Sequence, residues 1–164
     1  MPLEKLDKLE KLEKIYTHAE HTNCCTYFCI KGDFDPDVIS ERLGLAPEAS
    51  HKIGDKRSNG TAYDFAAWQF GTCKEYDIIV EHQMMKTIAP LLPKAAILRE
   101  IKREFDVAFT LEIVPTVRFD EDVPCLAPSL EVMQFCCDTG TELDIDLYVS
   151  CPDDFEDEII LENG

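Results

Sequence analysis

The stretch 26–54, TYFCIKGDFDPDVISERLGLAPEASHKIG, decides how the rest of the chain is interpreted. Its first residues, 26–31, alternate between the two faces of a half-buried strand, with apolar side chains on one of them. Asp35 then directly precedes Pro36, which is typical of a helix start because the carboxylate can cap the first turn and proline needs no hydrogen-bond acceptor there. The stretch therefore predicts a strand and then a helix of about two turns that ends at Gly44.

The remaining segments repeat this order of strands and helices. Strands are predicted near 25–31, 62–71, 107–119 and 142–150, and helices over 77–105, interrupted near its two prolines, and over 129–140. Two strand-helix-strand units predict an α+β fold with a ferredoxin-like, or split βαβ, sheet. The sheet is expected to have four mainly antiparallel strands, with helices on one face.

The last predicted strand alternates apolar and acidic residues. Its expected inward side chains are Leu143, Ile145, Leu147 and Val149, and its expected outward side chains are Glu142, Asp144 and Asp146.

Composition and charge limit the class of protein. The 164 residues include 33 Asp and Glu against 16 Lys and Arg, giving a formal net charge of −17. Such a charge repels phosphate backbones and anionic membranes, so we expect neither a nucleic acid nor a membrane as partner. The start of the chain alternates leucine with charges instead of forming a signal peptide, so we expect a cytoplasmic protein. One domain over 23–150 is predicted, with a helical arm over 1–22 and an acidic tail over 151–164.

The arm has leucine or isoleucine at every third position of 3–15, LEKLDKLEKLEKI. Opposite charges four residues apart favour a helix, but a three-residue spacing makes no heptad seam. The arm packs either on its own domain or on a second copy, and the second arrangement would form a homodimer.

Eight cysteines occur, at positions 24, 25, 29, 73, 125, 136, 137 and 151. Most have apolar neighbours, and without an export signal we expect them to be reduced. The weak metal-ligand candidates are His18, His21, Cys24 and Cys25. Their spacing is irregular for a structural zinc site, so neither a metal nor a cofactor is predicted.

A charged loop over 51–60, HKIGDKRSNG, follows the first helix. It suggests a ligand site where the first two loops meet, with the candidate residues Asp33, His51, Lys52, Asp55, Arg57 and Trp68. A purely structural interpretation uses the same residues, with Asp33 in a turn, Trp68 in the core and the loop as a solvated hairpin. No phosphate-loop, nucleophile-elbow or metalloprotease motif is present, so a binding role is favoured over an enzyme.

The segments GDFDPDVISERLGLAP, HKIGD and ELDIDLYV, with the single tryptophan, resemble a small bacterial family known as domain of unknown function 4279. The resemblance covers about residues 27–149. Its motif positions correspond here to Gly32, Asp33, Pro36, Leu43, Gly44, Pro47, Gly54, Asp55, Trp68, Asp144, Asp146 and Tyr148. The resemblance implies one bacterial domain and brings no activity or cofactor with it.

The charge leads to the functional hypothesis. A net charge of magnitude about 2 to 8 is enough to keep a small domain soluble, so the net charge of −17 needs a further explanation. We expect the protein to bind a basic partner, in an inhibitor or immunity-type role, through an acidic surface made of Glu112, Asp120, Glu121, Asp122, Glu142, Asp144 and Asp146. Evenly spread cytosolic acidity explains the total equally well. The alternative is a small-ligand-binding domain or an enzyme that uses the loop site around Asp33, His51, Asp55 and Trp68.

Overall fold

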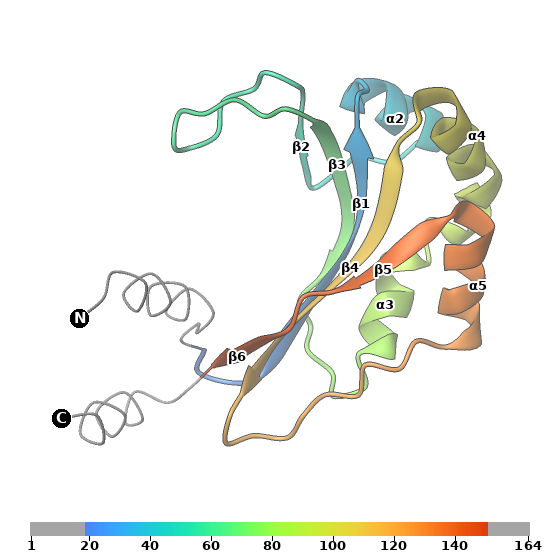
Figure 1. Ribbon diagram of the computed structural model, residues 1–164. Helices are drawn as coiled ribbons and strands as arrows, with labels where there is room; N and C mark the ends of the chain where they lie inside the picture. Colours follow the sequence, from blue (N-terminus) through green and yellow to red (C-terminus); the bar gives the residue numbers. More distant parts are fainter. Residues whose placement is uncertain (1–18, 151–164) are drawn as a thin grey trace, which may run out of the picture.

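The computed structural model describes residues 19–150, in which helices cover one face of a single curved sheet (Figure 1). The strands are β1 (Asn23–Gly32), β2 (Ala49–His51), β3 (Ala66–Cys73), β4 (Ala108–Arg118), β5 (Thr141–Ile145) and β6 (Tyr148–Ser150). The helices are α2 (Pro36–Leu43), α3 (Glu81–Ile88), α4 (Ala95–Phe105) and α5 (Leu130–Thr139), with a 3₁₀ turn η1 (Leu92–Lys94) before α4. The predicted arm, up to residue 18, and the predicted acidic tail lie outside the described residues.

The six strands form one mixed sheet in the order β2-β3-β1-β4-β5, and β6 also pairs with β4. Strand β1 is antiparallel to both β3 and β4, and β2 is antiparallel to β3. Strands β5 and β6 are parallel to β4. The α+β class is therefore confirmed, but the predicted sheet of four mainly antiparallel strands was too small.

The sequence prediction missed β2 and joined β5 to β6. Strand β2 has only three residues, and no alternation of buried and exposed positions marks it. With β2 included, β1 and β2 are parallel to each other, because β3 lies between them and is antiparallel to both. The predicted second strand is β3, which begins at Ala66, and the predicted last strand is interrupted at Asp146 and Leu147.

The helix ends follow the predicted capping chemistry. At the start of α2 the Asp35 side chain accepts a hydrogen bond from the backbone N–H of Asp37, and at its end Gly44 has a φ of 64°. The predicted long helical segment is divided as expected into α3 and α4, because η1 carries a proline between them. Ser129 caps α5 by accepting from the N–H of Val132.

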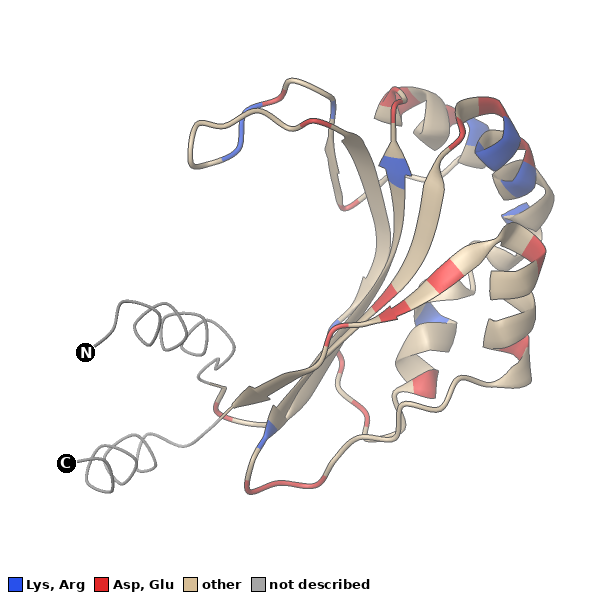
Figure 2. Ribbon diagram, viewed as in Figure 1, with Lys and Arg blue, Asp and Glu red and all other residues tan. Residues whose placement is uncertain are grey.

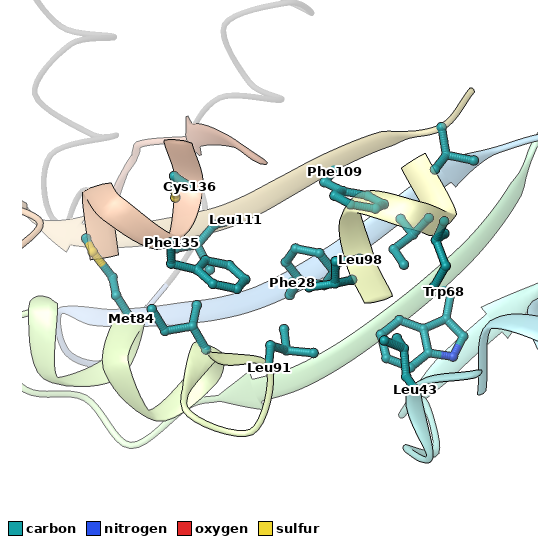
Figure 3. Close-up of a cluster of buried hydrophobic side chains, with 14 of the residues drawn as sticks. Phe28, Leu43, Trp68, Met84, Leu91, Leu98, Phe109, Leu111, Phe135 and Cys136 are labelled. Carbon is teal, nitrogen blue, oxygen red and sulfur yellow. The ribbon is translucent and has the colours of Figure 1, made fainter. Parts of the chain in front are cut away.

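The core lies between the helices and the middle of the sheet (Figure 3). Phe28, in the central strand β1, packs against Phe109 of β4 with ring centroids 5.6 Å apart, and against Phe135 of α5 at 6.2 Å. Trp68 is fully buried at the α2 end of this core. Because burying one such aromatic side chain contributes several kcal/mol, this cluster accounts for much of the stability of the sheet.

The expected inward residues of the last predicted strand are not buried. Leu143, Ile145, Leu147 and Val149 are 37%, 46%, 53% and 38% exposed, respectively. Strand β5 stands at the margin of the sheet and follows α5 directly, so the helix covers only its first residue, Thr141. The alternating pattern predicted extended structure in this segment correctly, but it missed the interruption between β5 and β6 and was wrong about the burial of these side chains.

Candidate functional site

The first candidate region lies at the end of the sheet where β1 ends and β3 begins. Gly32 pairs with Ala66, and His51 pairs with Ala67. Between β2 and β3, residues 52–65 form a hairpin that projects from the face without helices, which we call the open face (Figure 1). Five of the six predicted ligand-site residues belong to this end of the molecule, on the loop after β1, at the end of β2 or in the hairpin: Asp33, His51, Lys52, Asp55 and Arg57.

Trp68 does not belong to this region. It lies on the helix side of β3, because neighbouring residues of a strand point to opposite faces and Ala67 faces the open side. Its indole Nε1 donates a hydrogen bond to Ser40 Oγ at 3.0 Å, and its ring stacks on Phe70 with centroids 5.4 Å apart. The prediction that Trp68 lines the site was wrong, and its structural interpretation as a core residue is confirmed.

Lys52 ties the hairpin to the start of α2. Its Nζ lies 2.9 Å from Asp35 Oδ1 and 2.9 Å from Asp37 Oδ2. The backbone N–H of Lys52 donates a hydrogen bond to Asp55 Oδ2 at 2.8 Å. The hydrogen bonds to Asp37 and Asp35 raise the pKa of Lys52, and the hydrogen bond from Lys52 lowers the pKa of Asp35. These charges therefore hold two loops together, and Lys52 partly offsets the two carboxylates.

An aromatic stack forms the root of the hairpin. The rings of His51 and Tyr63 are parallel within 17° with centroids 3.5 Å apart, and Phe65 meets the His51 ring edge-on at 5.4 Å. Arg57 lies over the Tyr63 ring, with Cζ 4.6 Å from its centroid, and its Nη2 is 3.7 Å from Asp64 Oδ1. Sequence reasoning missed this stack because it assigned Tyr63 and Phe65 to a strand. The signal available was the pair of aromatic residues directly after a loop that contains a histidine.

Burial lowers the pKa of His51, which favours its neutral form. The charge of Asp55 and a backbone hydrogen bond at Phe65 act in the opposite direction but do not outweigh burial. Nε2 is buried and has no hydrogen-bond partner within the described part of the chain. A proton added at Nε2 would therefore lack an acceptor, so protonation there opposes the stacked arrangement.

A cavity of about 540 Å³ opens between the hairpin and the sheet. The small or polar side chains of Cys29, Ala67 and Gln69 lie beneath it, and His51 and Tyr63 line its side. Burial raises the pKa of the Cys29 thiol to about 11. Because the thiolate is the nucleophilic form, Cys29 is suited to a cavity wall and not to covalent catalysis. Asp55 and Lys56 supply the charged groups at the cavity.

The middle of the open face carries a paired polar cluster. Lys31 Nζ lies 3.0 Å from Glu112 Oε1, and Thr110 Oγ1 donates to the same oxygen at 2.9 Å. Burial by itself lowers the pKa of Lys31, but the hydrogen bond from Lys31 to Glu112 and the charge of Glu112 leave that pKa raised. The pKa of Tyr27 is raised mainly by burial and, to a smaller extent, by the charge of Glu112. Glu112 is only 5% exposed, so the prediction that it belongs to an outward acidic surface was wrong.

The second candidate region is the margin of the sheet beyond β4, where acidic residues lie along β5 (Figure 2). Glu142 and Asp144 are exposed and pair in register with Thr110 and Glu112, so they stand on the open face. Asp146, just after β5, is also exposed and accepts a hydrogen bond from the Tyr148 hydroxyl at 2.6 Å. We call Glu142, Asp144 and Asp146 the acidic edge. Within residues 19–150, no ion pair engages any of the three.

Asp120, Glu121 and Asp122 follow β4 at the other end of this margin, and two of them have local partners. Arg118 Nε lies 2.7 Å from Asp120 Oδ1, and this hydrogen bond lowers the pKa of Asp120. Glu121 accepts from His21 Nδ1 at 2.9 Å and from the Thr22 N–H at 2.6 Å; these two bonds lower its pKa to about 2. Of this predicted group, Asp120 and Asp122 are exposed and Glu121 is half-buried.

The weak metal-ligand candidates do not converge where the structure describes them. His21 pairs with Glu121, Cys24 is buried with a thiol pKa raised by burial to about 11, and His18 lies outside the described residues. Among residues 19–150, no group of three or more His, Cys, Asp or Glu is arranged to hold a metal ion. The same part of the chain has no helix long and apolar enough to cross a membrane.

The structure thus defines an α+β fold built on one mixed sheet, with a charged hairpin at one end and an acidic margin. The chain belongs to the family described as Domain of unknown function (DUF4279), whose model matches residues 20–150. This match confirms the resemblance found in the sequence. Comparisons with curated proteins and with solved structures found no match.

Proposed function

We propose that this protein is a binding module that recognises a basic protein partner, with an inhibitor or immunity-type role as its most concrete form. The observation that supports it best is the acidic edge, three exposed carboxylates with no cation paired to them in the described part of the chain. A concentrated field of one sign attracts a partner of the other sign and speeds its association. The proposal includes a cytoplasmic location, where eight cysteines would stay reduced.

The distribution of charge also favours a directed surface over an even coat. Several carboxylates near the hairpin and on α4 have a cation as partner: Lys52 is shared by Asp35 and Asp37, and Arg42 by Glu100 and Glu104. Residues 151–164 contain six Asp or Glu and no Lys or Arg, so they supply six of the seventeen net negative charges. Their sequence follows directly on β6, which lies on the same margin of the sheet.

The architecture adds to this proposal. We place the first four strands in the ferredoxin-like class, within a single domain over 23–150, because their order β2-β3-β1-β4 and the helices between them follow a β-α-β-β-α-β plan. Strand β4 would be an edge in that plan. The additional α5, β5 and β6 cover it and create a new margin, and this margin is the one that carries the acidic edge.

A charge-matched pair of variants tests the proposal. The edge variant is Glu142→Gln, Asp144→Asn, Asp146→Asn, and the control is Glu41→Gln, Glu81→Gln, Asp106→Asn on the helix side and at the end of α4. Both lose the same three charges. With lysozyme as a cationic probe, calorimetry at about 50 mM salt should show about tenfold weaker binding for the edge variant and less than about twofold for the control. Equal weakening in both variants would mean that the carboxylates are only a solvating coat.

A second candidate function is binding of a small polar ligand in the cavity beside the hairpin. The cavity of about 540 Å³ and the exposed side of the aromatic stack favour it, because ligand sites combine concave shape with a few polar groups. Saturation-transfer NMR with the common amino acids and nucleosides tests it. A bound compound should be lost with Ala67→Leu, which fills the cavity floor, and kept with Ala108→Leu, since Ala108 lies outside the cavity. Absence of any bound compound would refute this second function.

A further inference from the structure

Strand β5 ends the main path of the sheet, and within the described residues no strand pairs with its outer side. We infer that β5 is the docking edge for an extended segment of the partner, in which apolar residues alternate with Lys or Arg, and that this segment joins the sheet as an added strand. The inference rests on the proposed function and names the conformation and the residue pattern of the partner. Strand addition supplies backbone hydrogen bonds for affinity and alternate side chains for specificity.

The backbone of β5 shows which groups are available. The N–H of Asp146 donates to the Ile113 carbonyl at 2.9 Å, so at this position the backbone points toward β4. The direction alternates along a strand. The backbone groups of Asp144 and Glu142 therefore also point toward β4, while those of Leu143 and Ile145 point away from it. These two residues offer two N–H and two C=O groups to an added strand.

The side chains of β5 define the matching pattern. Leu143 and Ile145 stand on the helix side and are 37% and 46% exposed, whereas Glu142 and Asp144 stand on the open face. A strand laid beside β5 would place every second residue next to the two apolar side chains, and the residues between them next to the two carboxylates. Apolar residues at the first set and Lys or Arg at the second would complete both surfaces.

The edge is protected against strand pairing only by its short length and its two carboxylates. Natural edge strands are commonly blocked by lysine, proline or a bulge. The sequence TELDI of β5 contains no lysine, no proline and no glycine, and its pairing with β4 is regular over all five residues. Half-exposed apolar side chains on such an edge are a feature of an interaction surface.

Charge complementarity excludes the occupants that the chain itself could provide. A second copy paired through β5 would bring Glu142 and Asp144 close to the same carboxylates of its partner, which is unfavourable. Residues 151–164 have no Lys or Arg, so they would repel the edge as well. The arm sequence over 3–15 does contain lysines, but its leucines recur every three residues, whereas an added strand needs a period of two.

Four peptides of equal length and charge, titrated into the full chain, test the inference. The first alternates lysine and valine over eight residues, and the second carries the same residues in two blocks. The third and fourth keep the alternating order but carry backbone N-methyl groups, on the valine nitrogens in one and on the lysine nitrogens in the other. An added strand uses only one alternate set of N–H groups, so one methylated form should bind like the parent and the other at least about tenfold more weakly.

The expected readout is specific to β5. The alternating peptide should bind about tenfold more tightly than the block peptide, and hydrogen exchange should slow at the amides of Leu143 and Ile145. The double variant Glu142→Lys, Asp144→Lys should reverse the preference toward a peptide that alternates glutamate and valine. The matched control Glu41→Lys, Asp106→Lys should keep the original preference.

The outcomes separate the inference from the proposed function. If all the lysine peptides bind equally and salt weakens them alike, the acidic edge attracts cations without strand addition; the inference then fails and the proposed function stands. If none of them binds and the edge variant behaves like its control with lysozyme, the proposed function fails together with the inference.

Discussion

The hairpin end and the acidic edge carry similar residue types with opposite arrangements. At the hairpin end, Lys52 holds Asp35 and Asp37, and Arg57 lies over Tyr63. On the acidic edge, Glu142 and Asp144 alternate with half-exposed apolar residues, and no cation pairs with them in the described part of the chain. Charges that are matched within the fold stabilise its loops, whereas unmatched charges beside apolar surface remain available to a partner.

The same contrast appears between neighbours on one face. Glu112 and Asp144 are paired in register across β4 and β5. Glu112 is buried against Lys31, while Asp144 faces solvent. Sheet position alone therefore does not make a carboxylate part of a binding surface. What decides is whether an adjacent strand supplies a cation. Strand β1 does this for β4, whereas within residues 19–150 no strand lies beyond β5.

The largest expected effect concerns Trp68, which lies in the core on the helix side of β3 and not in the hairpin. Trp68→Ala should lower the free energy of unfolding by roughly 3 to 5 kcal/mol, because it opens a cavity in the core and removes the partner of Ser40. Chemical denaturation followed by circular dichroism measures it.

Tyr63→Ala is the matched control, since it removes an aromatic ring from the hairpin stack outside the core cluster. Its expected cost is below about 1 kcal/mol. Equal losses for the two variants would show that the hairpin stack is as much a part of the core as Trp68 is, and the distinction between core and hairpin would then fail.

Much of the fold was predictable from the sequence because its signals are local. The alternation after Thr26, the Asp35-Pro36 start and the Gly44 end of α2 each follow from a few adjacent residues. The division of the second helical segment likewise follows from its prolines. These elements match the structure because no distant contact competes with the local preference.

The missed features depend on neighbours distant in the sequence. Strand β2 exists only because β3 pairs with it, and nothing in its own three residues requires a strand. An alternating pattern gives the face of Leu143 or Glu112, but not which strands stand at the margin or which carry a cation nearby. For the same reason the sequence prediction placed the hairpin charges at one end of the sheet correctly but included Trp68 in the same site, although Trp68 faces the opposite side of the sheet.

An intermediate effect is expected from the two neighbouring carboxylates of the open face. Glu112→Ala removes the partner of Lys31, whose side chain is 42% exposed, so the ammonium is left only partly desolvated. We expect a loss of roughly 1 to 2 kcal/mol in the free energy of unfolding. Glu142→Ala should change it by less than about 0.5 kcal/mol, since that side chain is exposed.

A double-mutant cycle with Lys31→Met assigns the loss to the pair. The cost of Glu112→Ala should be smaller in the Lys31→Met background, because no ammonium is then left without its carboxylate. An unchanged cost in that background would mean that Glu112 acts through Thr110 or through packing, and the explanation by matched charge would be withdrawn.

The smallest expected effect is a pH dependence with opposite signs at two histidines. Burial lowers the pKa of His51 below its ordinary value of 6.5, whereas the hydrogen bond from His82 to Asp77 raises the pKa of His82. The folded state thus binds a proton less readily than the unfolded state at His51 and more readily at His82. Each histidine serves as the control for the other in one sample.

The signs follow from linkage. The stabilisation associated with His51 is fully present above pH 6.5 and is lost as the pH falls through that value toward the lower folded pKa. The contribution of His82 is fully present below pH 6.5 and is lost as the pH rises through its raised folded pKa. NMR titration of the two imidazole rings should therefore give two midpoints on opposite sides of 6.5.

The Tyr63 amide, which donates to the Asp55 carbonyl, should exchange faster as His51 becomes protonated, because the charged ring weakens the stack at the root of the hairpin. Coincident midpoints, or Tyr63 exchange that follows the His82 titration instead, would mean that burial does not favour the neutral form of His51.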